Sequence, residues 1–277
     1  MAAALAGDGA KVAIAARAAD EIERAVTDLR VRGTEVFGMA ADVGDSAQVH
    51  DLVAAVSARF GHLDILVNAA GVPGPIGPLW QAEPRDWCQT ININLLGTML
   101  CCKAAIPGMI AAGGGKIINF SGGGATGPRA FFSAYAASKA AVVRMTETLA
   151  EEVRPFGIDV NAVAPGMVNT RLLDAIELAG PAAGREPEML GALRKEPGRF
   201  VPAEIPAELV VFLASSASNG LTGRLVSAPH DDWQKWDKSR IKEISKLPWL
   251  TLRRMDRHTL QPFLDELVAA KRPPVKP

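Results

Sequence analysis

The sequence predicts an α/β protein with a doubly wound parallel sheet. Six short stretches rich in β-branched and apolar residues alternate with longer stretches in which apolar residues recur at three- and four-residue steps. Such alternation favours parallel strands joined by right-handed helical crossovers, with helices on both faces of the sheet. The stretch 63–67, apolar except for Asp64, fits a strand that is buried on both faces.

The strands are expected, in chain order, at residues 12–16, 35–40, 63–69, 116–121, 158–164 and 225–227. The helices between them are expected at 20–30, 47–60, 86–110, 135–153 and 204–214. Sheets of this kind bind ligands at the carboxyl ends of their strands, so the residues directly after each strand form the candidate site. The pattern stops near residue 229, which predicts one domain over 1–228 and a C-terminal extension over 229–277 that carries Trp233, Trp236 and Trp249.

Composition excludes several function classes. Thirty basic residues balance thirty acidic ones, so no charge excess favours nucleic acid as a partner. Three cysteines without a Cys-x-x-Cys spacing favour a reducing compartment, and we expect a cytoplasmic protein. No signal peptide or apolar run of membrane-spanning length is expected. The run His230-Asp231-Asp232 is more typical of a solvated turn than of a metal site, so no metal is predicted.

Tyr135 and Lys139 are the candidate chemical pair. Four residues apart on a predicted helix, they emerge from one helix face, one turn apart. A nearby ammonium favours the phenolate, and a lowering of the tyrosine pKa by about 3 units needs roughly 4 kcal/mol of differential stabilisation. Tyr135 is therefore a candidate general acid and base. An isolated pair at this spacing is more often two residues that only share a helix face, so the surrounding motifs decide.

Those motifs follow strand ends in a fixed order. They are Asn68-Ala69-Ala70-Gly71, Asn119-Phe120-Ser121-Gly122, Tyr135-Ala136-Ala137-Ser138-Lys139 and Pro165-Gly166-Met167-Val168-Asn169-Thr170. Together, over about residues 1–228, they resemble the short-chain dehydrogenase/reductase family of the classical type, whose fold is Rossmann-like. The resemblance implies an oxidoreductase that transfers hydride between a nicotinamide cofactor and an alcohol or carbonyl substrate, and that is a homodimer or homotetramer.

The resemblance also implies residue roles. Tyr135 is the expected acid/base, Lys139 supports it and holds the nicotinamide ribose, and Asn94 anchors a water relay behind Lys139. An asparagine in a long helix can also be a simple capping or exposed residue, but its amide offers the donor and acceptor that a relay requires. The cofactor-binding residues implied are Arg17, Asp42, Val43, Asn68, Ala69, Gly71, Tyr135, Lys139, Pro165, Gly166, Val168 and Thr170.

The residue after the first predicted strand favours NADP, although NAD stays possible. A carboxylate there would bind the ribose 2′-hydroxyl of NAD, whereas this chain has Ala16 and then Arg17, a cation suited to a 2′-phosphate. Arg17 could also be an ordinary solvated residue.

Two features depart from the family pattern. Gly122 stands where the family has a catalytic serine, and Ser121 and Ser133 are the candidate substitutes, with Ser121 the first choice. A lost hydrogen bond to a developing oxyanion commonly costs about 3 kcal/mol in the barrier. The family's first strand and its Thr-Gly-x-x-x-Gly-x-Gly turn also have no counterpart, because residues 1–6 match the end of the helix that follows them. We therefore expect an N-terminally truncated domain with unpaired edges on both neighbouring strands.

Two other glycine segments do not replace that turn. Gly7-Asp8-Gly9 precedes a strand and is expected to end a helix, and Gly113-Gly114-Gly115-Lys116 is followed by Ile117 and a strand, unlike a P-loop. The alternatives left open are a catalytically impaired scaffold or binding protein, favoured by Gly122, and a nucleotide-sugar epimerase or dehydratase, which shares the Tyr-x-x-x-Lys spacing. The variable stretch 171–199, where the family selects its substrate, contains no recognisable chemistry.

Overall fold

The computed structural model describes residues 1–196, 198–254 and 261. The strands are β1 (Val12–Ala16), β2 (Val36–Ala40), β3 (Ile65–Asn68), β4 (Gly115–Phe120), β5 (Ile158–Ala164) and β6 (Leu225–Ser227). The helices are α1 (Ala2–Gly7), α2 (Ala19–Val31), α3 (Ser46–Phe60), α4 (Pro84–Ile91), α5 (Gly97–Ala112), α6 (Ser133–Val153), α7 (Arg171–Ala179), α8 (Glu186–Arg194), α9 (Glu204–Ala214) and α10 (Lys238–Lys246).

Local sequence signals explain several helix ends. Asp45 caps α3, because its side chain accepts hydrogen bonds from the backbone N–H groups of Ala47 and Gln48. Pro84 opens α4 at a position where no helical N–H is needed. Gly113 ends α5 in the left-handed conformation at φ 85°, which confirms that the glycine run 113–115 is a helix-ending turn and not a P-loop.

The strands are parallel but form two sheets. β1 pairs with β2, and the larger sheet has the order β3-β4-β5-β6. Within the described residues no strand pairs with the second edge of β1 or with the outer edge of β3. The expected unpaired edges are therefore confirmed, as is the expected helix end in residues 1–6, where α1 lies and packs against α9 and β1.

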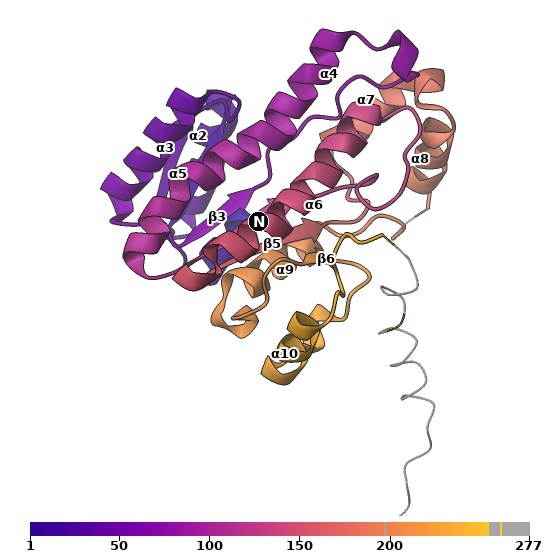
Figure 1. Cartoon of the computed structure of the whole chain (residues 1–277). Coiled ribbons are helices and arrows are strands. Elements are labelled where there is room, and N and C mark those ends of the chain that lie inside the picture. Colours follow the sequence, from indigo (N-terminus) through magenta and orange to yellow (C-terminus); the bar gives the residue numbers. More distant parts are fainter. Residues whose placement is uncertain (197, 255–260, 262–277) are drawn as a thin grey trace, which may run out of the picture.

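Helices cover both faces of the larger sheet (Figure 1). Neighbouring residues of β4 point to opposite faces: Ile117 packs with Met109 of α5, and Ile118 packs with Leu209 of α9. This alternation places one apolar cluster between the sheet and the α5–α6 pair and another between the sheet and α9. The doubly wound architecture predicted from the sequence is confirmed.

The segment after β6 packs against the domain itself. Trp233, Ile241 and Ile244 belong to the same apolar cluster as α9 and β5, and α10 lies beside this face in Figure 1. The guanidinium of Arg224 donates hydrogen bonds to the carbonyl oxygens of Ile244, Ser245 and Leu247, which satisfies the C-terminal end of α10. Residues 229–254 are thus joined to the domain by both apolar and polar contacts.

One continuous helical run, Pro84–Ala112, is long and apolar enough to cross a membrane by length and composition alone. This corrects the expectation that no apolar run approaches that length. A buried core helix passes the same test, and here Cys102, Ala105 and Met109 are buried against Ile117 of β4 and Val160 of β5. This packing explains the apolar residues on the face of the run that meets the sheet.

Candidate active site

Tyr135 and Lys139 lie in the first two turns of α6, at the carboxyl end of β4. Both side chains are buried, with 6% and 5% of their surface exposed. Tyr135 packs in an apolar cluster with Phe132, Leu173 and Ile176. The nitrogen Nζ of Lys139 lies 5.7 Å from the centre of the Tyr135 ring. The structure therefore brings the predicted pair together inside the protein and not on an exposed helix face.

The Lys139 ammonium is anchored to the end of β4. Its Nζ donates a hydrogen bond of 2.9 Å to the carbonyl oxygen of Phe120. Burial lowers the pKa of this ammonium to about 8. Lys139 is thus a fixed hydrogen-bond donor whose charge state responds to mildly alkaline pH.

Gly122 faces the hydroxyl of Tyr135. A Cβ atom built on Gly122 would lie 3.1 Å from Cζ of Tyr135 and only 2.3 Å from Oη, and the second distance is shorter than real Cβ atoms show. The phenol therefore occupies the space that a side chain at position 122 would need. The structure places position 122, and not Ser121, directly against the hydroxyl.

The two candidate substitutes for the missing serine are placed differently. Ser121 Oγ is buried and has no hydrogen-bond partner in the described part of the chain. Ser133 accepts a hydrogen bond of 3.2 Å from Nε1 of Trp87. Neither hydroxyl is hydrogen-bonded to Tyr135, so the role assigned to Ser121 stays a prediction.

The electrostatic surroundings of Tyr135 differ from the expectation. Burial raises the pKa of Tyr135, and the nearby Arg129 guanidinium opposes that rise. The sequence predicts only that the Lys139 ammonium lowers the pKa of Tyr135. Arg129 lies in the loop between β4 and α6, where no motif singles it out, and only the folded chain brings it over the Tyr135 ring, at 5.7 Å.

Asn94 connects the loop after β3 to α6. It lies in a π-helical segment, Asn92–Leu96, and is completely buried. Its Oδ1 accepts a hydrogen bond of 2.8 Å from the N–H of Val72, and its Nδ2 donates at 3.0 Å to both the Val72 carbonyl and Ser138 Oγ. The asparagine is therefore neither exposed nor a helix cap, because its amide is committed on both sides.

Gly71 lies between Asn94 and Lys139. A Cβ at Gly71 would be 3.4 Å from Asn94 Oδ1 and 3.5 Å from Lys139 Nζ. The ends of the two predicted relay side chains therefore meet at the exposed backbone that follows β3. The sequence pattern predicts one regular helix over 86–110 and does not show the π-helical turn that aims Asn94 there.

Asn68 has a structural role that sequence reasoning missed. Its Nδ2 donates a 2.9 Å hydrogen bond to Oδ1 of Asn119, and Nδ2 of Asn119 donates at 2.8 Å to Oγ1 of Thr146. This buried network links β3, β4 and α6. Only the backbone of Asn68, together with the exposed Ala69 and Gly71, is available to a cofactor at this strand end.

The other predicted cofactor-binding residues also follow strand ends. Arg17 is exposed after β1, Asp42 Oδ1 accepts from the Gly44 N–H after β2, and Val43 packs against Gly97. Pro165, Gly166, Val168 and Thr170 follow β5, and the exposed Thr170 makes no side-chain cap for α7. An ion pair between Arg171 of α7 and Glu21 of α2 joins the segments that follow Thr170 and Arg17.

These residues fit one end of a nicotinamide dinucleotide better than its middle. Lys139 offers a fixed donor, and the exposed Ala69-Ala70-Gly71 segment allows close approach of a flat ring and a ribose. Neither β1 nor β2 is followed by a glycine-rich turn that opens a helix, the usual pyrophosphate cradle. The described chain therefore has a donor and an open backbone segment suited to the nicotinamide end, whereas a phosphate cradle is not found at these two turns.

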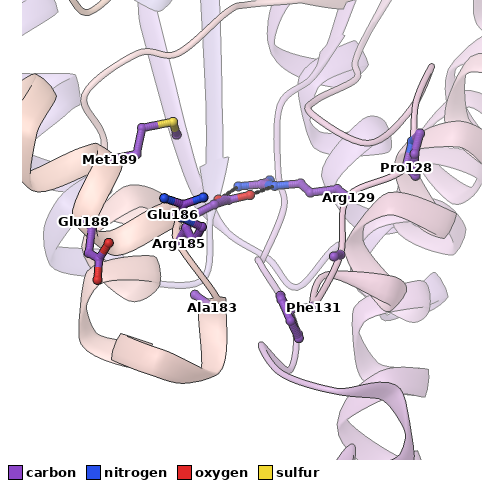
Figure 2. Close-up of a pocket in the computed structure, with 9 residues that line it drawn as sticks. Pro128, Arg129, Phe131, Ala183, Arg185, Glu186, Glu188 and Met189 are labelled. Carbon is purple, nitrogen blue, oxygen red and sulfur yellow. Dashed lines mark hydrogen bonds and ion pairs between the residues drawn. The ribbon is translucent and has the colours of Figure 1, made fainter.

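A cavity of about 640 Å³ lies beside this region, between the β4–α6 loop and α8 (Figure 2). Tyr135 and Lys139 do not line it. Its walls include Arg129, Phe131, Glu186 and Met189, and Arg129 separates it from the Tyr135 side of α6.

A buried tyrosine–lysine pair at the strand ends of a doubly wound sheet is typical of enzymes that move a proton while a nicotinamide cofactor moves hydride. Comparison with known proteins agrees with this class. A family model described as short chain dehydrogenase matches residues 1–179. The chain belongs to the short-chain dehydrogenase/reductase family of oxidoreductases.

Similar proteins include dehydrogenases of small hydroxylated molecules. The chain is 38% identical over 226 residues to cis-4-hydroxycyclohexanecarboxylate dehydrogenase of Sinomonas cyclohexanicum, a match that covers 80% of this chain and 86% of the relative. It is 37% identical over 233 residues to D-threitol dehydrogenase of Mycolicibacterium smegmatis, covering 79% and 86%.

Solved structures with the same fold contain either cofactor. An NAD⁺-bound xylitol dehydrogenase matches with a TM-score of 0.75 and 29% identity, covering 82% of this chain and 90% of that structure. An actinorhodin polyketide ketoreductase with NADPH matches with a TM-score of 0.75 and 30% identity, covering 82% and 88%. The neighbours support a nicotinamide cofactor and do not distinguish NAD from NADP.

Proposed function

We propose that this protein interconverts an alcohol and a carbonyl with NADP(H), and that Tyr135 is the acid/base. The observation that carries the proposal is the buried Tyr135 beside Lys139 and Asn94 at the carboxyl ends of β3 and β4. In reduction, the Tyr135 hydroxyl gives its proton to the substrate oxygen, and in oxidation the phenolate takes it back. The bound nicotinamide supplies or accepts the hydride.

Lys139 and Asn94 support that proton transfer. The hydrogen bond to Phe120 holds Lys139 Nζ near the ring of Tyr135, where its positive charge favours the phenolate. Asn94 fixes the loop at Val72, and its amide lies within reach of the same backbone segment as Lys139. Protons lost by Tyr135 would then be replaced through Lys139 and a water relay behind it, to which Asn94 contributes by holding the loop at Val72 in place.

The preference for NADP depends on Arg17. It is exposed directly after β1, where a carboxylate would serve NAD. We expect Arg17→Asp to lower kcat/KM for NADPH at least about tenfold, equivalent to ~1.4 kcal/mol, and to raise the value for NADH. Equal use of both cofactors by the wild type, unchanged by the substitution, would contradict the NADP assignment.

The decisive experiment measures substrate-dependent oxidation of NADPH by the purified chain. The panel should include cyclic hydroxy acids, open-chain polyols and their oxidised forms, because similar dehydrogenases act on such molecules. We expect turnover that Tyr135→Phe abolishes while NADPH binding is retained.

Gly122 favours a second candidate, a scaffold or binding protein that keeps the fold but not efficient catalysis. It removes the hydroxyl that would hold the substrate oxygen. NADPH binding without turnover across the whole panel would favour this candidate. Turnover abolished by Tyr135→Phe would exclude it.

We also propose a cytoplasmic homodimer or homotetramer. The three unpaired cysteines support the compartment, and the resemblance to the family supports the assembly. Light scattering of the purified chain measures the assembly, and a monomer at micromolar concentration would contradict it.

A further inference from the structure

Arg129 is held rigidly in the loop between β4 and α6. Its Nε and Nη2 donate hydrogen bonds of 2.8 and 2.5 Å to the two carboxylate oxygens of Glu186 in α8 (Figure 2). The guanidinium also stacks 3.9 Å from the ring centre of Phe132. A bidentate ion pair and a stacked ring fix both the position and the plane of this cation. Only 18% of the Arg129 side chain is exposed.

The glycine-rich loop allows Arg129 to approach α6. A Cβ at Gly124 would lie 2.7 Å from Cβ of Ala136 and 3.2 Å from Cβ of Arg129, and Gly124 has a φ of +93°. A Cβ at Gly123 would lie 3.5 Å from Nη1 of Arg129. The loop therefore packs closely between the arginine and the helix that bears Tyr135.

Two cations flank the Tyr135 ring at equal distance. The guanidinium carbon of Arg129 and the Nζ of Lys139 each lie 5.7 Å from the ring centre. Glu186 is the carboxylate paired with Arg129, and its side chain is one quarter exposed.

Other charges near this region are committed elsewhere or lie on the cavity. In α7, which packs against Tyr135 through Leu173 and Ile176, Asp174 and Glu177 pair with Arg194. From the start of α8 and the residue before it, Glu188 and Arg185 line the cavity on the far side of Arg129.

We propose that Arg129, held by Glu186, is a positioning residue that stabilises the Tyr135 phenolate. The inference rests on the proposed function, in which Tyr135 gives its proton to the substrate oxygen and is left as a phenolate. Arg129 transfers no proton; its fixed charge acts on the phenolate through space. Burial raises the pKa of Tyr135, and Arg129 is the group that opposes the rise.

The chain offers a direct probe, because Tyr135 is its only tyrosine. Phenolate absorbance in the near ultraviolet therefore reports the ionisation of this one residue, without substrate or cofactor. The titration uses rapid pH jumps, so that absorbance is read before alkaline unfolding.

We expect Arg129→Met to raise the pKa of Tyr135 by more than about 0.5 units, a roughly threefold change in its ionisation constant. Arg129→Lys keeps the positive charge, so it should shift the pKa of Tyr135 by less than half as much as Arg129→Met does. Arg154→Met is the matched control: it removes an ion-paired arginine just after α6, about 28 Å along the helix axis from Tyr135, and should leave the titration unchanged.

If Arg129→Met does not fold, Arg129→Gln gives a second neutral variant that can still hydrogen-bond Glu186. An unchanged or lowered Tyr135 pKa in a folded neutral variant would overturn the proposal. If the enzyme is active, the pKa that Tyr135 contributes to the pH profile of kcat should shift by the same amount as the pKa measured by absorbance. A shifted titration in a protein without turnover would refute the proposed function and leave the electrostatic coupling established.

Discussion

Replacing Gly122 by alanine tests whether the Tyr135 hydroxyl truly fills the space opposite this residue. The added Cβ would lie 2.3 Å from Oη, whereas ordinary contacts begin at 3.4 Å, so one of the two groups must move by about 1.1 Å (3.4 − 2.3). Tyr135 cannot simply retreat, because Phe132, Leu173 and Ile176 pack around it. Gly122→Ser, which would restore the residue usual in the family, meets the same contact.

The expected cost follows from two opposing effects. Overpacking of a well-packed site costs about 1–3 kcal/mol, and replacing glycine by alanine returns about 0.4–1 kcal/mol through the unfolded chain. The net loss in free energy of unfolding is about 1–2 kcal/mol, equivalent to a fall in Tm of roughly 2–8 °C. The pKa of Tyr135 should change as well, because its hydroxyl is displaced.

Chemical denaturation and thermal unfolding measure the loss. Gly127→Ala is the matched control, since Gly127 lies in the same loop and a Cβ there meets nothing within 4 Å. If Gly122→Ala is as stable as Gly127→Ala within about 0.5 kcal/mol, and the Tyr135 titration is unchanged, the close contact between Gly122 and the phenol is refuted.

Three further substitutions test other parts of the site and its frame. The pKa of Lys139 is lowered from 10.5 to about 8 in the fold, so the unfolded chain binds more protons between these values and the Lys139 contribution to the free energy of unfolding rises with pH by up to about 3 kcal/mol. Burial raises the pKa of Cys101 to about 11 and that of Cys102 to about 12, so these thiols lower stability at the alkaline end of the same range. Urea denaturation of the wild type and Lys139→Met at pH 7 and 10 isolates the Lys139 contribution, and an equal pH dependence in both proteins would contradict it. Asn119→Ala removes two buried hydrogen bonds, one from Asn68 and one to Thr146, and should cost about 2–4 kcal/mol by the same method, and a cost below about 1 kcal/mol would contradict the network. Glu147→Ala removes the carboxylate that accepts from Leu252 N–H and Arg253, so proteolytic cleavage after Arg253 should accelerate, whereas an unchanged rate would show that apolar packing alone holds this segment.

Sequence patterns predict the elements whose burial is regular. The strand over 158–164 is found with those bounds, because both of its faces pack against helices and both of its edges pair with neighbouring strands. The helix expected at 86–110 is found as a run from Pro84 to Ala112, but with a π-helical turn inside it. Helices α7 and α8 and the later α10 were not predicted, because the variable stretch and the tail match no family motif.

The sequence predicts only those site residues that belong to recognisable motifs. The Tyr135–Lys139 spacing predicts that these two side chains share one helix face. The strand-end motifs predict that their residues lie at one edge of the sheet. Arg129 has no motif, and its position over Tyr135 depends on Glu186, 57 residues later in the chain. The inward turn of the Asn68 side chain depends on its pairing with Asn119 across two strands. Such long-range contacts leave no periodic signal in the sequence.

The division of the strands into two sheets affects how stability is distributed through the molecule. The β1–β2 sheet has its own small apolar cluster with α2, centred on Val12, Ile22 and Val26, and is joined to the larger sheet by helix packing and not by a shared ladder of hydrogen bonds. Units connected in this way can open separately from the rest of a protein. Amide protons of β1 and β2 should therefore exchange with solvent through a local opening. Those of β4 and β5 should exchange only when the whole domain unfolds.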